Sequence, residues 1–230
     1  LSVSKAKGRL QALRDQIDDG KAVQGVVGIG HTRWATHGAP SDTNSHPHLS
    51  DSGKIAVVHN GIIENEAMLR RQLEENGVKF HSETDTEVIS NLMGYYYDLC
   101  SDFISAVRLA MRRLEGSFAL AIMCADRPGT VIAVKKDSPL IFGFGQGENF
   151  VASDVPAILQ YTQTVAYLDD GDMAIFDADH VVFLDAMGDP LEKKREIITW
   201  ELGAAERGGY DHFMMKEIFE QPKALRDTIS

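Results

Sequence analysis

The chain has 230 residues, of which 43% are hydrophobic, and its formal net charge is −11 at pH 7. This length allows one large domain or two small ones with a substantial core. The acidic balance disfavours nucleic-acid binding, no apolar run approaches the roughly 18 residues of a membrane span, and the two cysteines exclude a disulfide framework. Because the first residues also lack the apolar run of a signal peptide, we expect a cytoplasmic protein without nucleic-acid or membrane partners.

The first half of the chain is predicted to be mainly helical. An amphipathic helix is expected near 8–18, a strand over GVVGIGH (25–31), and a long polar loop over 32–54. A strand over 55–59 then runs into Asn60-Gly61, a dipeptide typical of a hairpin turn. Three helices with start or stop signals follow, the first capped by Asn65 and the second opened by Thr84: 65–76, 84–99 and 102–115.

The second half changes to short β-branched or aromatic segments separated by turns, which predict strands. Their close spacing favours antiparallel pairing, so the fold class is predicted as α+β. Past Trp200 the periodicity fades, 206–212 resembles a linker, and the final segment predicts a helix interrupted at Pro222. The predicted strands are 117–125, 130–136, 140–144, 149–153, 164–168, 172–177 and 180–185.

Five of the eight histidines fall between 31 and 59, which raises the question of a metal site. Imidazole is a common metal ligand, but the spacing matches no HExxH pair and no cysteine lies nearby. We therefore favour histidines that brace an irregular loop, and we expect no metal and no cofactor. The five are His31, His37, His46, His48 and His59.

Two short motifs carry candidate binding chemistry. In HTRWATHG (31–38), the Arg33 fork suits a carboxylate and Trp34 could cover a ligand, although a surface loop with a buried tryptophan fits the pattern equally well. In SETDTE (82–87), Asp85 could pair with a ligand ammonium, although a helix cap with acidic first-turn residues explains it fully.

Asn60-Gly61 is the candidate for catalysis. An Asn side-chain amide beside a Gly backbone N–H supplies two donors that converge on one point, as a developing oxyanion requires. An ordinary hairpin turn is the favoured reading of the dipeptide by itself. Neither Cys100 nor Cys124 has a nearby His or cation in sequence that would lower its thiol pKa, so both are expected to be buried and inert.

Taken together and in order, the motifs resemble the glutaminase domains of the glutamine–fructose-6-phosphate aminotransferase (glucosamine-6-phosphate synthase) family. These belong to the class II glutamine amidotransferases. Amidophosphoribosyltransferases of the same class typically carry tyrosine and serine where this chain has Trp34 and Ala35. The motifs are HTRWATHG, NSHPH, VVHNGIIEN, SETDTEV, GENFVASD and MMKEIFEQP, and they span nearly the whole chain.

The resemblance implies the N-terminal-nucleophile hydrolase fold, a four-layer αββα sandwich of two antiparallel sheets. It implies hydrolysis of L-glutamine to glutamate and ammonia, with the ammonia passed to a sugar isomerase domain that converts fructose 6-phosphate to glucosamine 6-phosphate. Residues 1–210 would form the glutaminase domain and residues 211–230 the linker toward that isomerase domain. Homo-oligomers would form through the isomerase domain.

The resemblance also assigns roles to individual residues. Arg33 would grip the glutamine α-carboxylate and Asp85 its α-ammonium, while Trp34 would act as a lid. Asn60 and the Gly61 N–H would form the oxyanion hole. Thr36 and His37 would line the same pocket, and His46 and His59 would support it.

One departure from the family pattern bears on activity. The family nucleophile is a cysteine at the mature N-terminus, whereas this chain begins at Leu1, so the N-terminal part with its first strand and nucleophile is expected to be missing. Neither cysteine present matches that position. Two alternatives therefore stay open: an inert truncated glutamine-binding domain, and the glutaminase domain of another class II amidotransferase.

Overall fold

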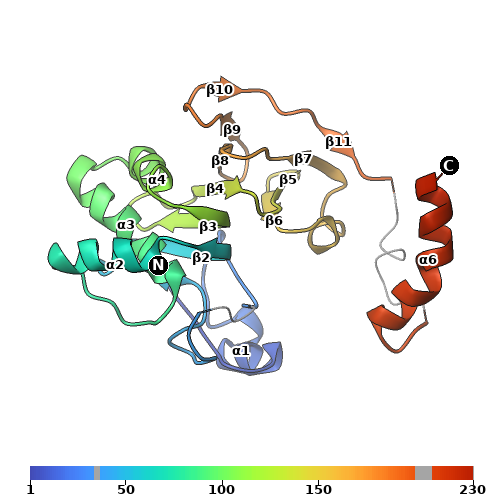
Figure 1. Ribbon diagram of the computed structural model, residues 1–230, viewed down its shortest axis with the longest axis horizontal. Coiled ribbons are helices and arrows are strands. Elements are labelled where there is room, and N and C mark those ends of the chain that lie inside the picture. The colour runs from blue at the N-terminus through green and yellow to red at the C-terminus, as the bar shows by residue number, and fades with distance from the viewer. Residues whose placement is uncertain (34–36, 200–208, 230) are drawn as a thin grey trace.

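The computed structural model describes residues 1–33, 37–199 and 209–229, and it contains two antiparallel sheets (Figure 1). The larger sheet has the strand order β1-β2-β3-β4-β8-β9-β10 and the smaller β11-β7-β5-β6. The strands of the larger sheet are β1 His48–Leu49, β2 Ile55–Ile63, β3 Gly116–Cys124, β4 Val131–Lys136, β8 Met173–Phe176, β9 Val181–Leu184 and β10 Pro190–Leu191. Those of the smaller sheet are β5 Ile141–Phe144, β6 Asn149–Ala152, β7 Thr164–Tyr167 and β11 Glu196–Ile197.

Helices cover one face of the larger sheet, and the smaller sheet packs against its other face (Figure 1). Helices α2, α3 and α4 bury their apolar sides on β2 and β3, with Ile89, Met93 and Leu120 among the fully buried side chains. The α-helices are α1 Leu10–Gln16, α2 Glu66–Glu75, α3 Asp85–Cys100, α4 Phe103–Met111 and α6 Phe213–Ile229, and the short 3₁₀ turns are η1 Asp18–Gly20 and η2 Val155–Ala157.

A second core fills the space between the two sheets. Phe142 of β5 is fully buried there and meets Phe176 and Phe183 of the larger sheet edge to face, with ring centroids 5.1 and 5.3 Å apart. Burial of one such ring contributes about 1.5–3 kcal/mol. A third, smaller cluster around Val155 and Val165 covers the outer face of the smaller sheet.

The predicted α+β class and antiparallel pairing are confirmed, and all seven strands predicted in the second half are present. The structure adds the two-residue strands β1, β10 and β11, which are too short to leave a pattern in the sequence. Helices α2, α3 and α4 lie where they were predicted, although α4 ends at Met111 rather than near 115.

The turn predicted at Asn60-Gly61 is wrong, because both residues lie inside β2. They pair with Ala119 and Phe118 of β3, so the strand continues to Ile63. Gly61 has φ +123°, and a Cβ there would lie 2.1 Å from the Ser117 carbonyl oxygen. The glycine is therefore required by the close approach of two strands, which a dipeptide rule for turns does not detect.

The strand predicted over 25–31 is also wrong. Among the described residues no strand pairs with this segment, although its burial alternates: Val27 and Ile29 pack against the core between the sheets, while Val26 is fully exposed. The alternation in sequence matches this burial, but a strand additionally needs a hydrogen-bonded neighbour.

Three smaller expectations also fail. Asn65 does not cap α2, because its side chain instead accepts from Glu115 N–H and donates to the Arg113 carbonyl. Helix α6 continues through Pro222 rather than breaking there. Cys100 is exposed rather than buried, since it ends α3 at the surface.

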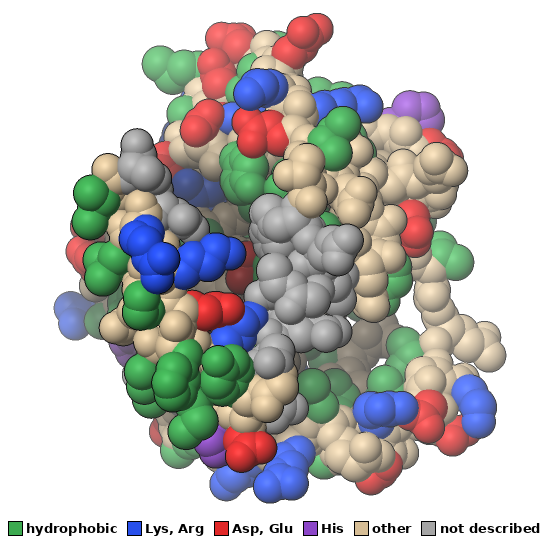
Figure 2. Space-filling model, turned by 90° about the vertical axis from the view of Figure 1, so that its right-hand side faces the viewer, with side chains coloured by type: hydrophobic (Ala, Val, Ile, Leu, Met, Phe, Trp, Pro, Cys, Tyr) green, Lys and Arg blue, Asp and Glu red, His purple; other side chains and the backbone are tan. Residues whose placement is uncertain are grey.

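Helix α6 lies beyond the smaller sheet, on the side away from α2–α4 (Figure 1). Its exposed side chains include several large hydrophobic ones, and green side chains gather in the lower left of the face that Figure 2 presents. Within the described part of the chain, no helix is both long and apolar enough for a membrane crossing. The exposed hydrophobic residues of α6 are Phe213, Met214, Met215, Ile218, Phe219, Leu225 and Ile229.

Candidate functional site

A cavity of about 260 Å³ lies where the segment after His31, strand β2 and the start of helix α3 meet. Most residues singled out from the sequence lie in its lining, although they come from distant parts of the chain. Trp34 and Thr36 lie outside the described residues. The singled-out residues that line the cavity are Arg33, His37, His46, His59, Asn60, Gly61 and Asp85.

Asp85 provides a buried carboxylate in this cavity. It is the first residue of α3, is 4% exposed, and its Oδ2 accepts from the Ile63 N–H at 3.0 Å. The positive end of the helix dipole favours a negative charge at this position. Among the described residues no Lys or Arg pairs with it, and its ion-pair neighbours are the Nδ1 atoms of His37 and His59, each 3.9 Å away. The site can therefore accept an external cation.

His59 does not neutralise this carboxylate. Burial lowers the pKa of His59 to about 4, although the nearby Asp85 charge opposes the shift. The ring is consequently neutral at pH 7. The Nδ1 of His37 is also buried at the cavity, and it has no hydrogen-bond partner among the described residues. A neutral His59 and a His37 whose Nδ1 has no hydrogen-bond partner among the described residues thus lie beside Asp85.

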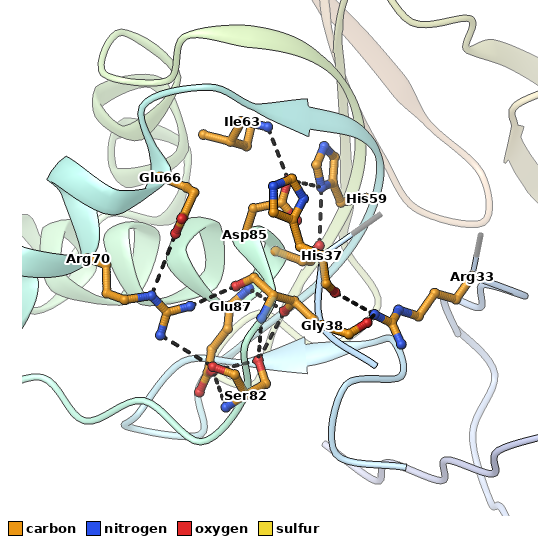
Figure 3. Close-up of polar contacts among 12 residues, drawn as sticks. Arg33, His37, Gly38, His59, Ile63, Glu66, Arg70, Ser82, Asp85 and Glu87 are labelled. Atoms are coloured by element: carbon orange, nitrogen blue, oxygen red, sulfur yellow. Dashed lines mark hydrogen bonds and ion pairs between the residues drawn. The ribbon is translucent and has the colours of Figure 1, made fainter. Parts of the chain in front are cut away.

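The loop that leads into Asp85 is fixed by two charged side chains (Figure 3). Glu87 is buried and accepts from the N–H groups of His81 and Ser82 at 2.7 and 2.6 Å. Arg70 of α2 donates to the carbonyls of Ser82 and Thr84. Thr84 caps the helix as predicted by accepting from Glu87 N–H. Asp85 therefore lies on a braced helix start rather than on a loose loop.

Arg33 lies at the cavity, but its guanidinium pairs with no carboxylate of the described residues. Its Nη2 donates to the carbonyls of His37 and Gly38 at 2.6 and 2.9 Å (Figure 3). A guanidinium has five N–H donors, so donors remain for an anionic ligand. Arg33 itself has φ +49°, a left-handed backbone that non-glycine residues adopt infrequently. These contacts hold the Arg33 guanidinium against the main chain of His37 and Gly38.

Asn60 and Gly61 lie side by side on the β2 wall of the cavity. The Asn60 Oδ1 is 2.6 Å from His31 Nε2, a contact between residues 29 positions apart. Among the described residues the Asn60 side-chain nitrogen has no hydrogen-bond partner. A side-chain amide and a glycine main chain therefore face the same space.

The predicted supporting histidines form part of a connected chain of polar contacts. His46 Nδ1 accepts from the His59 N–H at 3.4 Å, and its Nε2 lies 3.2 Å from the Thr86 hydroxyl. That hydroxyl is 3.1 Å from His59 Nδ1. Burial lowers the pKa of His46 to about 2, and the neighbouring histidines add to the shift. Neutral rings thus tie the polar loop to β2 and α3.

The histidine cluster provides no metal site among the described residues, where no group of three or more His, Cys, Asp or Glu side chains is arranged to hold an ion. Neither cysteine lines the cavity: Cys100 ends α3 and Cys124 is buried in β3.

The sequence of the site matches a known family. The family described as glutamine amidotransferase domain matches residues 31–160, more than half of the chain. The chain belongs to this family. It is a class II glutamine amidotransferase domain, and its matched region contains every cavity residue named above.

Curated relatives extend the similarity to the full chain. The glutamine–fructose-6-phosphate aminotransferase of Caldanaerobacter subterraneus is 54% identical over 229 residues, and that of Clostridium acetobutylicum is 50% identical over 230 residues. The enzyme of the same name from Pyrococcus horikoshii is 48% identical over 229 residues. These matches cover 99–100% of this chain but only 37–38% of the relatives.

A solved structure supports the fold. The glutamine phosphoribosylpyrophosphate amidotransferase from B. subtilis matches with a TM-score of 0.52 and 24% identity, covering 74% of this chain and 34% of that protein. The match agrees with a mixed α+β architecture built on two antiparallel sheets.

The sequence patterns do not single out five residues of the cavity lining, which are His31, Ile62, Thr84, Thr86 and Ser117. In sequence, His31 is one of the clustered histidines and Thr86 is part of a helix cap. Their contacts join residues 29 and 40 positions apart, respectively. Only the position of His31 inside the HTRWATHG motif offered a signal.

Proposed function

We propose that the chain is the glutaminase part of a glutamine–fructose-6-phosphate aminotransferase. It would hydrolyse L-glutamine to glutamate and ammonia, and the ammonia would reach an isomerase domain that forms glucosamine 6-phosphate from fructose 6-phosphate. The observation that carries the proposal is the buried Asp85 carboxylate, which lacks a Lys or Arg partner among the described residues and faces a cavity that Asn60 and Gly61 also line.

The opposite charges of Asp85 and Arg33 in the cavity lining suit a free amino acid. Asp85 would hold the α-ammonium, and the remaining donors of Arg33 would hold the α-carboxylate. The side-chain amide of the substrate would then extend toward Asn60 and Gly61. Trp34 and Thr36 would complete the pocket, and His37 would line it beside Asp85.

The reaction requires a nucleophile that forms a thioester with the substrate carbonyl and releases ammonia. In the proposed mechanism the C–N bond breaks as the nitrogen takes up a proton, and water then hydrolyses the thioester to glutamate. The oxyanion formed at each addition step would accept hydrogen bonds from Asn60 Nδ2 and the Gly61 N–H, each worth on the order of 2.7–4 kcal/mol. An N-terminal cysteine of the complete polypeptide would be the nucleophile, because neither Cys100 nor Cys124 lines the cavity.

The end of the chain suits a connection to a further domain. Helix α6 exposes Met214, Ile218 and Phe219 by 73, 56 and 65%. Apolar side chains in such a patch are commonly covered by a partner surface. We propose that the linker at 211–230 packs on the isomerase domain, through which homo-oligomers would also form. We also propose that the complete domain is a four-layer αββα sandwich. The structure describes three of these layers, which are helices α2–α4 and the two sheets, and a second helical layer would be the fourth.

The proposal is tested by incubating the complete polypeptide with L-glutamine and fructose 6-phosphate. Production of glutamate together with glucosamine 6-phosphate is expected. Glutamate release without amino-sugar formation would indicate another class II amidotransferase, and glutamine binding without release would indicate an inert binding domain. Cys100→Ser and Cys124→Ser are the matched controls, and both should retain activity.

A further inference from the structure

We propose that His31 is a positioning residue that orients the Asn60 amide toward the substrate, and that the main chain of Arg33 determines which tautomer His31 adopts. This inference rests on the proposed function, since it assigns the source of one oxyanion donor. The His31 imidazole links two elements of the site, the main chain at Arg33 and the β2 wall that carries Asn60.

The main chain of Arg33 determines the His31 tautomer. The Arg33 backbone N–H donates to His31 Nδ1 at 2.8 Å. A backbone amide can only donate, so Nδ1 is the acceptor and carries no proton. The proton of the neutral ring is therefore on Nε2.

The His31 tautomer in turn determines the orientation of the Asn60 amide. Oxygen and nitrogen of an Asn side chain are assigned from the hydrogen bonds that they make. The His31 Nε2–H must face an acceptor, and Asn60 Oδ1 lies 2.6 Å from it. The Asn60 Nδ2 consequently points away from the ring, and no described residue accepts its hydrogens. Two N–H donors are thus held available at the cavity wall.

The His31 ring is held in place by its neighbours. His31 stacks on His46, with ring centroids 4.3 Å apart and planes inclined by 27°. His46 is itself held by the His59 main chain and the Thr86 hydroxyl. Neighbours on both edges and one face therefore fix the plane of His31 and, through it, the Asn60 amide.

This arrangement couples substrate binding to the oxyanion donor. A displacement of the Arg33 main chain would remove the donor that holds Nδ1 unprotonated. The other tautomer could then form, in which Nε2 accepts from Asn60 Nδ2 and the amide turns its oxygen toward the cavity. A carbonyl oxygen in that place repels an oxyanion, so the catalytic orientation depends on the position of the Arg33 segment.

The test compares two amide replacements in the complete polypeptide. Gln at position 31 can place its N–H near the original Nε2, whereas Asn is too short and places it near Nδ1. We expect His31→Asn to lower kcat for glutamate release about 100- to 1,000-fold with KM within about threefold, as for loss of an oxyanion donor. His31→Gln should retain kcat within about tenfold. His180→Ala, at an exposed turn, is the control and should match the unaltered protein.

The outcomes separate this inference from the proposed function. No glutamate release by the unaltered polypeptide would overturn the proposed function and, with it, this inference. Release by the unaltered polypeptide together with equal kcat values for the Asn and Gln variants would overturn the inference alone. A loss confined to KM, or a fall in thermal midpoint that accounts for the lost activity in both variants, would assign His31 a merely structural role and would also overturn it.

Discussion

The main-chain N–H of Ile63 donates to the carboxylate of Asp85 at 3.0 Å, joining the end of β2 to the first residue of α3. This bond orients the buried carboxylate toward the cavity. Among the described residues no Lys or Arg pairs with that carboxylate. Burying an isolated carboxylate is costly unless hydrogen bonds or a cation compensate. The helix dipole and the Ile63 N–H compensate in part, and a bound ammonium would supply the rest.

Asp85→Asn should therefore raise KM for glutamine strongly. The amide keeps the shape and still accepts from the Ile63 N–H, but it loses the charge that attracts the ammonium. Loss of one partner of a buried charge pair predicts an increase of about 100-fold, or ~3 kcal/mol, with a smaller change in kcat. Steady-state kinetics of glutamate release by the complete polypeptide provides the measurement. Asp126→Asn, at the surface beside Lys54, is the matched control, and an unchanged KM for Asp85→Asn would contradict the ammonium role.

We predict that Arg33 requires the planar, forked geometry of its guanidinium as well as its positive charge. Its Nη2 donates to the carbonyls of His37 and Gly38 and its Nη1 to that of Ala39, so three of its five N–H donors hold the loop and two remain for a ligand. A lysine cannot serve both directions with one ammonium. Arg33→Lys should lower kcat/KM about 100-fold, chiefly through KM. A kcat/KM within threefold of the unaltered protein would show that charge alone suffices.

The sequence predicted the fold best where local pattern and tertiary contact agree. Strands β3, β4, β5 and β8 bury most of their residues, and the start signal at Thr84 coincides with a side chain that caps α3. It failed at Gly61, where the reason for glycine is the Ser117 carbonyl on a neighbouring strand. The strand prediction failed again at 25–31, because an alternating sequence pattern reports alternating burial and does not identify a hydrogen-bonded partner strand.

The candidate site was predicted through whole motifs rather than through separate residues. A turn at Asn60-Gly61 and a helix cap at Asp85 were sufficient explanations of those positions in isolation. The structure places them in one cavity, but the contact that orients Asn60 comes from His31, 29 positions away. The spacing of residues along the sequence does not predict the contact between His31 and Asn60, because that contact depends on how the polar segment packs against β2.

Buried neutral histidines should make stability fall in mild acid. Burial lowers the pKa of His48 to about 3, and His59 titrates near 4, whereas both are near 6.5 when unfolded. Below about pH 6.5 the unfolded chain therefore binds protons that the folded chain does not, so folding stability decreases as pH falls. At pH 5 each ring should cost about 2 kcal/mol relative to pH 7.5.

Urea unfolding at pH 7.5 and pH 5, followed by circular dichroism, measures this effect. His48→Gln keeps a polar group beside Thr84 but cannot titrate, so it should reduce the stability difference between the two pH values by about 2 kcal/mol. His180→Gln removes an exposed imidazole and should leave the difference unchanged. An equal pH dependence in the His48→Gln protein and the unaltered protein would refute a buried neutral His48.

Gly61 and Gly77 offer a matched pair for separating backbone strain from steric conflict. Both have positive φ, +123° and +85°, but a Cβ at Gly77 meets no atom within 4 Å, whereas at Gly61 it would lie 2.1 Å from the Ser117 carbonyl oxygen. Gly77→Ala should cost only the ~1–2 kcal/mol of a left-handed alanine. Gly61→Ala must also separate β2 from β3 and should cost at least ~1–3 kcal/mol more. Urea midpoints of the two variants measure the difference, and equal losses would mean that the strands yield without cost. Because Gly61 lines the cavity, its alanine variant should also lose glutamate release, whereas the Gly77 variant should keep it.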